Sequence, residues 1–115
     1  MQSVSSDAVA RALGTWETIA TDNSTYSIKG IETANGKYLS IHLHNYYFTY
    51  GQSIATLPAK WRPYFVTRFL VLVRTATTYI IGFSNISNDG SVALFCDDTG
   101  GDAFTDMIVK IFEDF

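Results

Sequence analysis

The sequence predicts an all-β protein, built as a small antiparallel β-sandwich or barrel. From Trp16 onward, apolar and polar residues alternate with the period of a strand, and turn signals recur at short intervals. No long helical pattern separates these segments, which favours packed antiparallel sheets. With 115 residues, 47% of them hydrophobic, the chain has enough apolar side chains for one domain with its own core.

The first fourteen residues differ from the rest, because SSDAVARALG favours a short helix with a serine cap at its start and Gly14 at its end. Val9 and Leu13 lie four positions apart and form a narrow apolar stripe. A helix this short is not stable alone in water, so another surface must cover the stripe. Either the same domain or another subunit supplies that surface. We therefore divide the chain into a helical neck, residues 1–14, and a β head, residues 15–115.

Eight strands are predicted in the head, each rich in Thr, Val, Ile, Tyr or Phe. They cover Thr15–Ala20, Thr25–Thr33, Lys37–Leu43, Ser53–Leu57, Phe65–Arg74, Thr77–Ile86, Ser91–Cys96 and Asp106–Phe112. Two turn signals join neighbouring strands. In ANGK, Asn35 and Gly36 tolerate the positive φ of a type I′ hairpin turn, and SNDGS at residues 87–91 is a second such signal.

The fifth predicted strand differs from the third in its pattern. The third contains YLSIHL, in which apolar and polar residues alternate, so that one of its faces belongs in the core. In the fifth, Phe69, Val71 and Val73 point one way, and the equally apolar Leu70 and Leu72 point the other. A domain of this size seldom covers both faces of a strand, so we expect a neighbouring subunit to cover one of them.

Both prolines of the chain lie in the stretch IATLPAKWRP, residues 54–63. Proline fixes its own φ and pushes the preceding residue into extended backbone, so the stretch is predicted to leave the strand without forming a helix. We expect Trp61 to anchor this crossing and Arg62 to hydrogen-bond nearby backbone or a carboxylate.

Charge and composition exclude several kinds of partner. The net charge is −3 and the basic residues are scattered, which argues against nucleic acid. A single cysteine, Cys96, allows no internal disulfide and is predicted to be a buried thiol. The longest apolar run, Phe69–Val73, is far shorter than the roughly twenty residues of a membrane helix, and no targeting signal is recognisable, so membrane insertion is not expected.

Three stretches resemble the C-terminal head domains of bacteriophage tail-fibre and receptor-binding proteins. IATLPAKWRP is similar to their Ile-Ala-Thr-Leu-Pro motif, which an aromatic residue and Arg-Pro follow; here Lys60 and Trp61 replace the common Gly and Tyr. GKYLSIHL before the motif and ISNDGSVALF after it stand in the same order as in those heads. VSSDAVARALGTW resembles the segment through which a trimeric shaft enters the head. The resemblance covers most of the chain, and only residues 97–106 match no part of the pattern.

The resemblance implies a homotrimer, in which neighbouring subunits would cover Val9, Leu13 and the fifth strand. It also implies a longer shaft that joins other phage tail or baseplate proteins, a location in the virion at the tail tip or baseplate, and reversible attachment to a host cell-wall saccharide. Two alternatives remain: a structural tail or baseplate protein without a ligand and, with less support, a fragment of a glycan-depolymerising tail spike.

Two segments carry the candidate saccharide contacts. HLHNYYFTYG, residues 42–51, contributes His42, His44, Tyr46 and Tyr47, and DDTGGD, residues 97–102, contributes Asp97 and Asp98. Aromatic rings stack on the apolar faces of sugars, and imidazoles and carboxylates bind hydroxyl groups. The alternative for residues 46–50 is that they continue a core strand.

Metal and catalytic sites have weaker support. His42 and His44 lie two apart on one strand face and suit a metal, but the spacing indicates no third ligand. The carboxylates of residues 97–102 suit calcium but lack an EF-hand pattern, which favours a solvated turn and leaves calcium binding open. No nucleophile elbow, zinc-protease motif or phosphate loop is present, so no enzyme activity and no cofactor are predicted.

Overall fold

The computed structural model describes residues 15–97 and 100–113, and these residues are all-β, as predicted. One turn of 3-10 helix, η1 (Ala59–Trp61), interrupts eight strands. The strands are β1 (Glu17–Thr21), β2 (Tyr26–Thr33), β3 (Gly36–Thr49), β4 (Ser53–Thr56), β5 (Thr67–Arg74), β6 (Tyr79–Ile86), β7 (Ser91–Phe95) and β8 (Gly100–Ile111). Each overlaps a predicted strand. The predicted helical neck, residues 1–14, lies outside the described residues.

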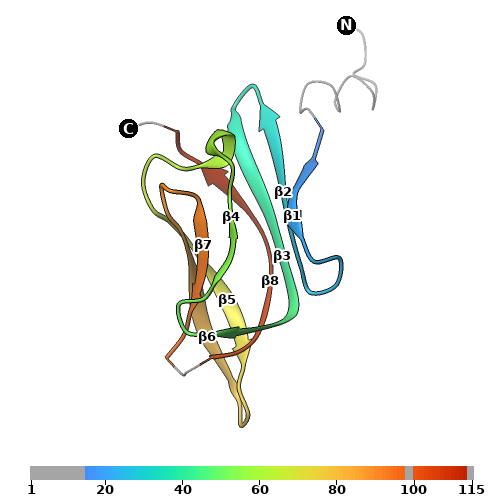
Figure 1. Cartoon of the computed structure of the whole chain (residues 1–115), viewed down its shortest axis with the longest axis vertical. Helices are drawn as coiled ribbons and strands as arrows, with labels where there is room; N and C mark the ends of the chain where they lie inside the picture. The colour runs from blue at the N-terminus through green and yellow to red at the C-terminus, as the bar shows by residue number, and fades with distance from the viewer. Residues whose placement is uncertain (1–14, 98–99, 114–115) are drawn as a thin grey trace, which may run out of the picture.

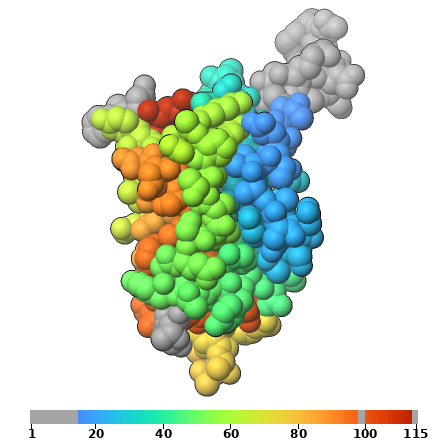
Figure 2. Space-filling model, in the orientation of Figure 1, coloured from blue at the N-terminus to red at the C-terminus, as the bar shows by residue number. Residues whose placement is uncertain are grey.

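The strands form one antiparallel sheet in the order β1-β2-β3-β8-β5-β6-β7-β4. The sheet curls on itself, so that the expected sandwich or barrel is a nearly closed barrel (Figure 1). On the face seen in Figure 2, β4 and the segment after it lie between β7 (orange) and β1 (blue). The described chain begins and ends at the same end of the barrel, and the turn between β5 and β6 lies at the opposite end (Figure 1).

Two short turns shape neighbouring strand pairs. ANGK forms the β2–β3 hairpin, although of its Asn-Gly pair only Gly36 has a positive φ, 129°. The predicted type I′ assignment, which needs a positive φ at both residues, is therefore wrong in this detail. In SNDGS, the Gly90 N–H donates to the Ser87 carbonyl at 2.9 Å, which closes the turn from β6 to β7.

The core contains the residues that the alternation placed on the inner face. In β3, Leu39 and Ile41 are fully buried, and in β5 the inner face is buried as well. The outer face of β5 is open in the single chain, where Leu70 is 64% and Leu72 40% exposed. The apolar pattern on both faces of β5 therefore corresponds to burial on one face only within this subunit.

The stretch IATLPAKWRP closes the barrel beside β2. Trp61 is only 3% exposed and covers Gly30, where an added Cβ would lie 2.6 Å from the indole ring. The Arg62 Nε donates to the Leu57 carbonyl at 2.9 Å, so both expected roles are confirmed. The expectation that no helix forms here is wrong by one 3-10 turn. That turn fits between the prolines because its two hydrogen bonds, from the Trp61 N–H to the Pro58 carbonyl and from the Arg62 N–H to the Ala59 carbonyl, need no N–H from either proline.

Candidate functional site

A β-bulge at Asn45 decides which β3 side chains face outward. Asn45 has a left-handed φ of 61°, and the pairing of β3 with β8 shifts between His44 and Tyr46. Because side chains alternate along a strand, one extra residue reverses the faces beyond it. His42 and His44 therefore share the outer face with Tyr47, whereas Tyr46 packs against the core and makes an edge contact with Tyr26 at 5.5 Å. The alternative that residues 46–50 continue a core strand is therefore correct in part: β3 extends to Thr49 and buries Phe48, but Tyr47 and Tyr50 are exposed.

Burial also acts on the Tyr46 hydroxyl. The pKa of Tyr46 is raised, first by burial and then by the neighbouring Tyr26 and Asp22. A raised pKa keeps the phenol neutral, as expected for a ring that completes the core.

Beyond the bulge, four outward side chains form a row across four strands. Tyr47 of β3 pairs with Asp102 of β8, Asp102 with Arg74 of β5, and Arg74 with Tyr79 of β6. Residues paired in this way lie on the same face of a sheet. Tyr47 and Tyr79 are 69% and 57% exposed. This cross-strand row therefore presents an ion pair between two open aromatic rings.

The ion pair at the centre of the row is held from several sides. The Arg74 Nη2 donates to Asp102 Oδ2 at 3.1 Å and also to the Asn45 Oδ1. The guanidinium carbon lies 5.4 Å from the centre of the Phe104 ring. The pKa of Arg74 is raised, chiefly by the hydrogen bond to Asp102 and further by Tyr79. The arginine thus stays charged and fixes the orientation of the Asp102 carboxylate.

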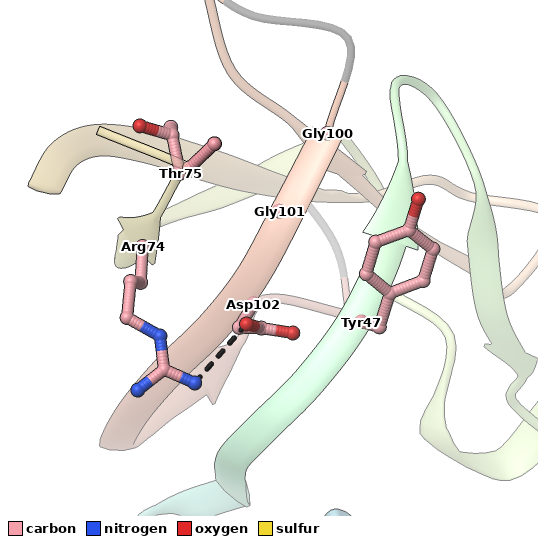
Figure 3. A pocket seen from close by; sticks show the side chains of 7 residues that line it. Tyr47, Arg74, Thr75, Gly100, Gly101 and Asp102 are labelled. Carbon is pink, nitrogen blue, oxygen red and sulfur yellow. Dashed lines mark hydrogen bonds and ion pairs between the residues drawn. The ribbon is translucent and has the colours of Figure 1, made fainter. Parts of the chain in front are cut away.

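A pocket of about 410 Å³ opens beside this row. Its lining residues are Tyr47, Arg74, Thr75, Ala76, Gly100, Gly101 and Asp102. Figure 3 shows Tyr47 on one side of Asp102 and Arg74 on the other, each from a different strand. A Cβ added at Gly101 would lie 2.5 Å from the Arg74 carbonyl oxygen, so β8 can run this close to β5 only with glycine there. This part of the pocket therefore presents backbone rather than side chains.

The two predicted histidines lie near this pocket but do not line it. The rings of His42 and His44 stack at 6.5 Å with an angle of 3° between their planes. His44 makes an edge contact with Phe104 at 5.5 Å, and His42 Nδ1 lies 3.9 Å from Asp106 Oδ1. They form a neighbouring polar surface on the same face of the sheet.

The predicted acidic segment is divided by the structure. Asp97 is exposed and does not line the pocket, and Asp98 lies outside the described residues. Residues 100–102 belong to β8 rather than to a loop. Within residues 15–97 and 100–113, no three His, Cys, Asp or Glu side chains are grouped so as to hold a metal ion.

Sequence reasoning missed Arg74 and Tyr79 as site residues. The signal was present in RTATTY, residues 74–79, where an arginine and a tyrosine flank a threonine-rich turn. Recognised as a hairpin, this stretch would have placed the two side chains opposite each other. Their position beside Tyr47 and Asp102, however, depends on the pairing of β5 with β8, which no local pattern indicates.

The pocket lies beside the β5–β6 turn, at the end of the barrel opposite to the start and end of the described chain (Figure 1).

Neither models of known protein families nor curated protein sequences match this chain. In the part of the chain that the structure describes, no helix is long and apolar enough to cross a membrane.

Proposed function

We propose that this chain is the receptor-binding head of a bacteriophage tail-fibre or baseplate protein, and that it attaches the virion to a saccharide on the host cell surface. The observation that carries this proposal is the pocket beside the cross-strand row, with Tyr47 and the Arg74–Asp102 pair. Aromatic faces and fixed polar groups are the features by which proteins hold sugars. The sequence resemblance points to the same function.

The position of the pocket suits attachment. A head carried on a shaft needs its binding site at the end away from the shaft. The pocket lies at the end opposite to the described chain start (Figure 1). In this arrangement the site would be the part of the virion that meets the host surface first.

The outer faces of two strand pairs differ in polarity, and the apolar one supports assembly into a homotrimer. Ser40, His42 and Lys29 give the outer face of β2 and β3 a polar character, whereas Leu70, Leu72 and Ile81 make that of β5 and β6 apolar. Ile81 is 62% exposed and lies opposite Leu72. Open apolar surface of this kind is typical of subunit contacts, so we propose that neighbouring copies cover it.

Binding without catalysis is the better-supported function of the pocket. Glycoside hydrolysis commonly uses two carboxyl groups on either side of the scissile bond. Among the described lining residues only Asp102 carries a carboxyl group, and it is paired with Arg74. A structural tail protein without a ligand is the remaining alternative, and it is tested together with the site.

The test is to apply the labelled head to an array of bacterial surface glycans and to host cells. Tyr47→Ala should weaken saccharide binding about tenfold, because it removes the exposed stacking ring. Tyr64→Ala is the matched control, since Tyr64 is also exposed but does not line the pocket. His44→Ala separately tests the neighbouring histidines.

Three results bear on different parts of the proposal. Undiminished binding by Tyr47→Ala would reject this pocket as the site. If the head binds host cells but no purified polysaccharide competes for that binding, the receptor is a protein. Binding to neither glycans nor cells would reject host attachment and favour the structural alternative.

A further inference from the structure

We infer that the pocket selects an uncharged saccharide, held by adjacent hydroxyl groups on the Asp102 carboxylate, and rejects glycans that carry phosphate or carboxylate at this position. This inference rests on the proposed function, because it names the chemical class of ligand that the same site would take.

The first argument is the charge balance of the lining. Among the described lining residues, Arg74 is the only cation and Asp102 the only anion, so their charges cancel. The Asp102 carboxylate, bonded to the Arg74 Nη2, compensates the arginine charge, so the described lining residues offer an anionic ligand no uncompensated cation. The next charged side chain on this face of β8 is Asp106, which is also acidic. An anionic group in the pocket would therefore lie beside a carboxylate without a cation of its own.

The second argument is the direction of the available hydrogen bonds. The Arg74 guanidinium donates to Asp102 Oδ2, and the described residues supply no donor to Oδ1. A carboxylate accepts hydrogen bonds and cannot donate them when ionised. The ligand must therefore donate, as sugar hydroxyl groups do and as an ionised phosphate does not. Because Arg74 holds the carboxylate still, two neighbouring hydroxyl groups can bond to it without reordering the site.

The third argument is the shape of the lining around this carboxylate. The Tyr47 ring stands on the neighbouring strand beside Asp102 (Figure 3). Gly100 and Gly101 line the pocket with backbone atoms alone, next to the Asp102 carboxylate. A sugar ring can thus lie against Tyr47 with its apolar face while its edge hydroxyl groups reach Asp102.

The experiment compares neutral, phosphorylated and uronate-bearing bacterial glycans on one array, and then measures the best binder at two salt concentrations. We expect the bound glycans to be neutral and their dissociation constants to change less than about twofold between about 0.05 M and about 0.5 M sodium chloride, because no ligand charge is screened. A preference for charged glycans, with affinity falling several-fold in salt, would overturn the inference but leave the proposed function standing. An absence of any bound glycan would reject the proposed saccharide binding, and this inference with it.

Asp102→Asn gives the sharpest second readout. The variant should bind the neutral glycan about tenfold more weakly, because a charged acceptor is replaced by a neutral one. An anionic ligand would instead bind this variant more tightly, since a like charge has been removed, and that result would overturn the inference. Glu32→Gln, an exposed acid-to-amide change on β2 outside the pocket lining, is the control and should bind as the unmodified protein does. Circular dichroism of each variant verifies that the barrel is folded.

Discussion

At the scale of single residues, the side chains of Trp61 and Asp22 each fix a backbone segment outside the strands. Trp61 lies over Gly30 of β2 and joins the segment after β4 to the other edge of the sheet. Lys60 adds to this contact, with its Nζ 5.0 Å from the centre of the Trp61 ring and 3.4 Å from Glu17. A buried indole on a bare glycine therefore closes the barrel where no strand hydrogen bonds do.

Trp61→Ala should lower the free energy of unfolding by roughly 3–5 kcal/mol, because the buried ring would leave a cavity over Gly30. Thermal unfolding followed by circular dichroism measures the loss. Tyr64→Ala removes an exposed aromatic ring a few residues away and should change the free energy of unfolding little. Unchanged melting together with lost saccharide binding would show that Trp61 belongs to a binding site instead.

Asp22 holds the turn between β1 and β2. Its Oδ1 accepts hydrogen bonds from the Ser24, Thr25 and Tyr26 N–H groups at 2.9, 2.7 and 3.0 Å, and its Oδ2 accepts one from the Thr25 hydroxyl. These bonds favour the charged carboxylate and hold the pKa of Asp22 far below its ordinary value, the Thr25 hydroxyl contributing most.

The depressed pKa predicts the direction of an acid effect. The stabilisation from Asp22 is fully present above the unfolded-state pKa of about 4 and is lost progressively as the pH falls from there toward the lower folded-state pKa. In the Asp22→Asn variant this contribution no longer titrates. The free energy of unfolding of the variant should therefore fall less steeply between about pH 5 and pH 2 than that of the unmodified protein. Urea unfolding at a series of pH values measures both slopes. Equal slopes would mean that Asp22 does not contribute to acid sensitivity.

At the scale of elements, the β3 bulge determines which chemistry reaches the surface. Without the extra residue at Asn45, Tyr47 would point toward the core and Tyr46 outward. Asn45 fits this position for two reasons: asparagine tolerates a left-handed backbone, and its side chain accepts a hydrogen bond from Arg74. The bulge thus connects the fold of β3 to the geometry of the cross-strand row.

Asn45→Val should cost about 1–2 kcal/mol of folding free energy, because a branched side chain is strained at positive φ. Saccharide affinity should fall as well, since Tyr47 and Arg74 would lose their alignment. Asn45→Asp is the matched control, because it keeps both the tolerance for this backbone and an acceptor for Arg74. Chemical denaturation and glycan binding report the two effects, and equal behaviour of the two variants would show that the bulge does not depend on this residue.

At the scale of the whole molecule, exposed apolar side chains lie on the outer faces of β5 and β6, where Leu70, Leu72 and Ile81 are open in the single chain. A single barrel of this size can bury only one face of each strand. The apolar residues on the outer faces of β5 and β6 therefore remain in water unless another subunit covers them. This open apolar surface supports the proposed homotrimer.

Light scattering should give a molar mass of three times 12.8 kDa for the unmodified chain. Ile81→Asp should dissociate the assembly, because a charge would be buried without a partner in each contact. Thr18→Asp places the same charge on the exposed outer face of β1 and should leave the mass unchanged. A stable monomer of the unmodified chain at micromolar concentration would contradict the trimer.

The sequence by itself determined the all-β class and the approximate positions of eight strands. The alternation of Leu39, Ile41 and Leu43 with polar residues depends only on residues that are close in the sequence, and so do the turns of ANGK and SNDGS. The role of Trp61 was also predicted from the sequence, as the large aromatic anchor of a backbone crossing that two prolines fix.

Only the tertiary structure decided how far β3 and β8 extend and which side chains meet at the pocket. Asn45 interrupts the alternation of β3, and Gly100 and Gly101 suggest a loop, so both strands were predicted too short. The row from Tyr47 to Tyr79 joins four strands whose order along the sheet differs from their order along the chain. Local periodicity determines the face on which a side chain lies, whereas its neighbours across the sheet depend on the register between distant segments, which the whole barrel sets as it closes.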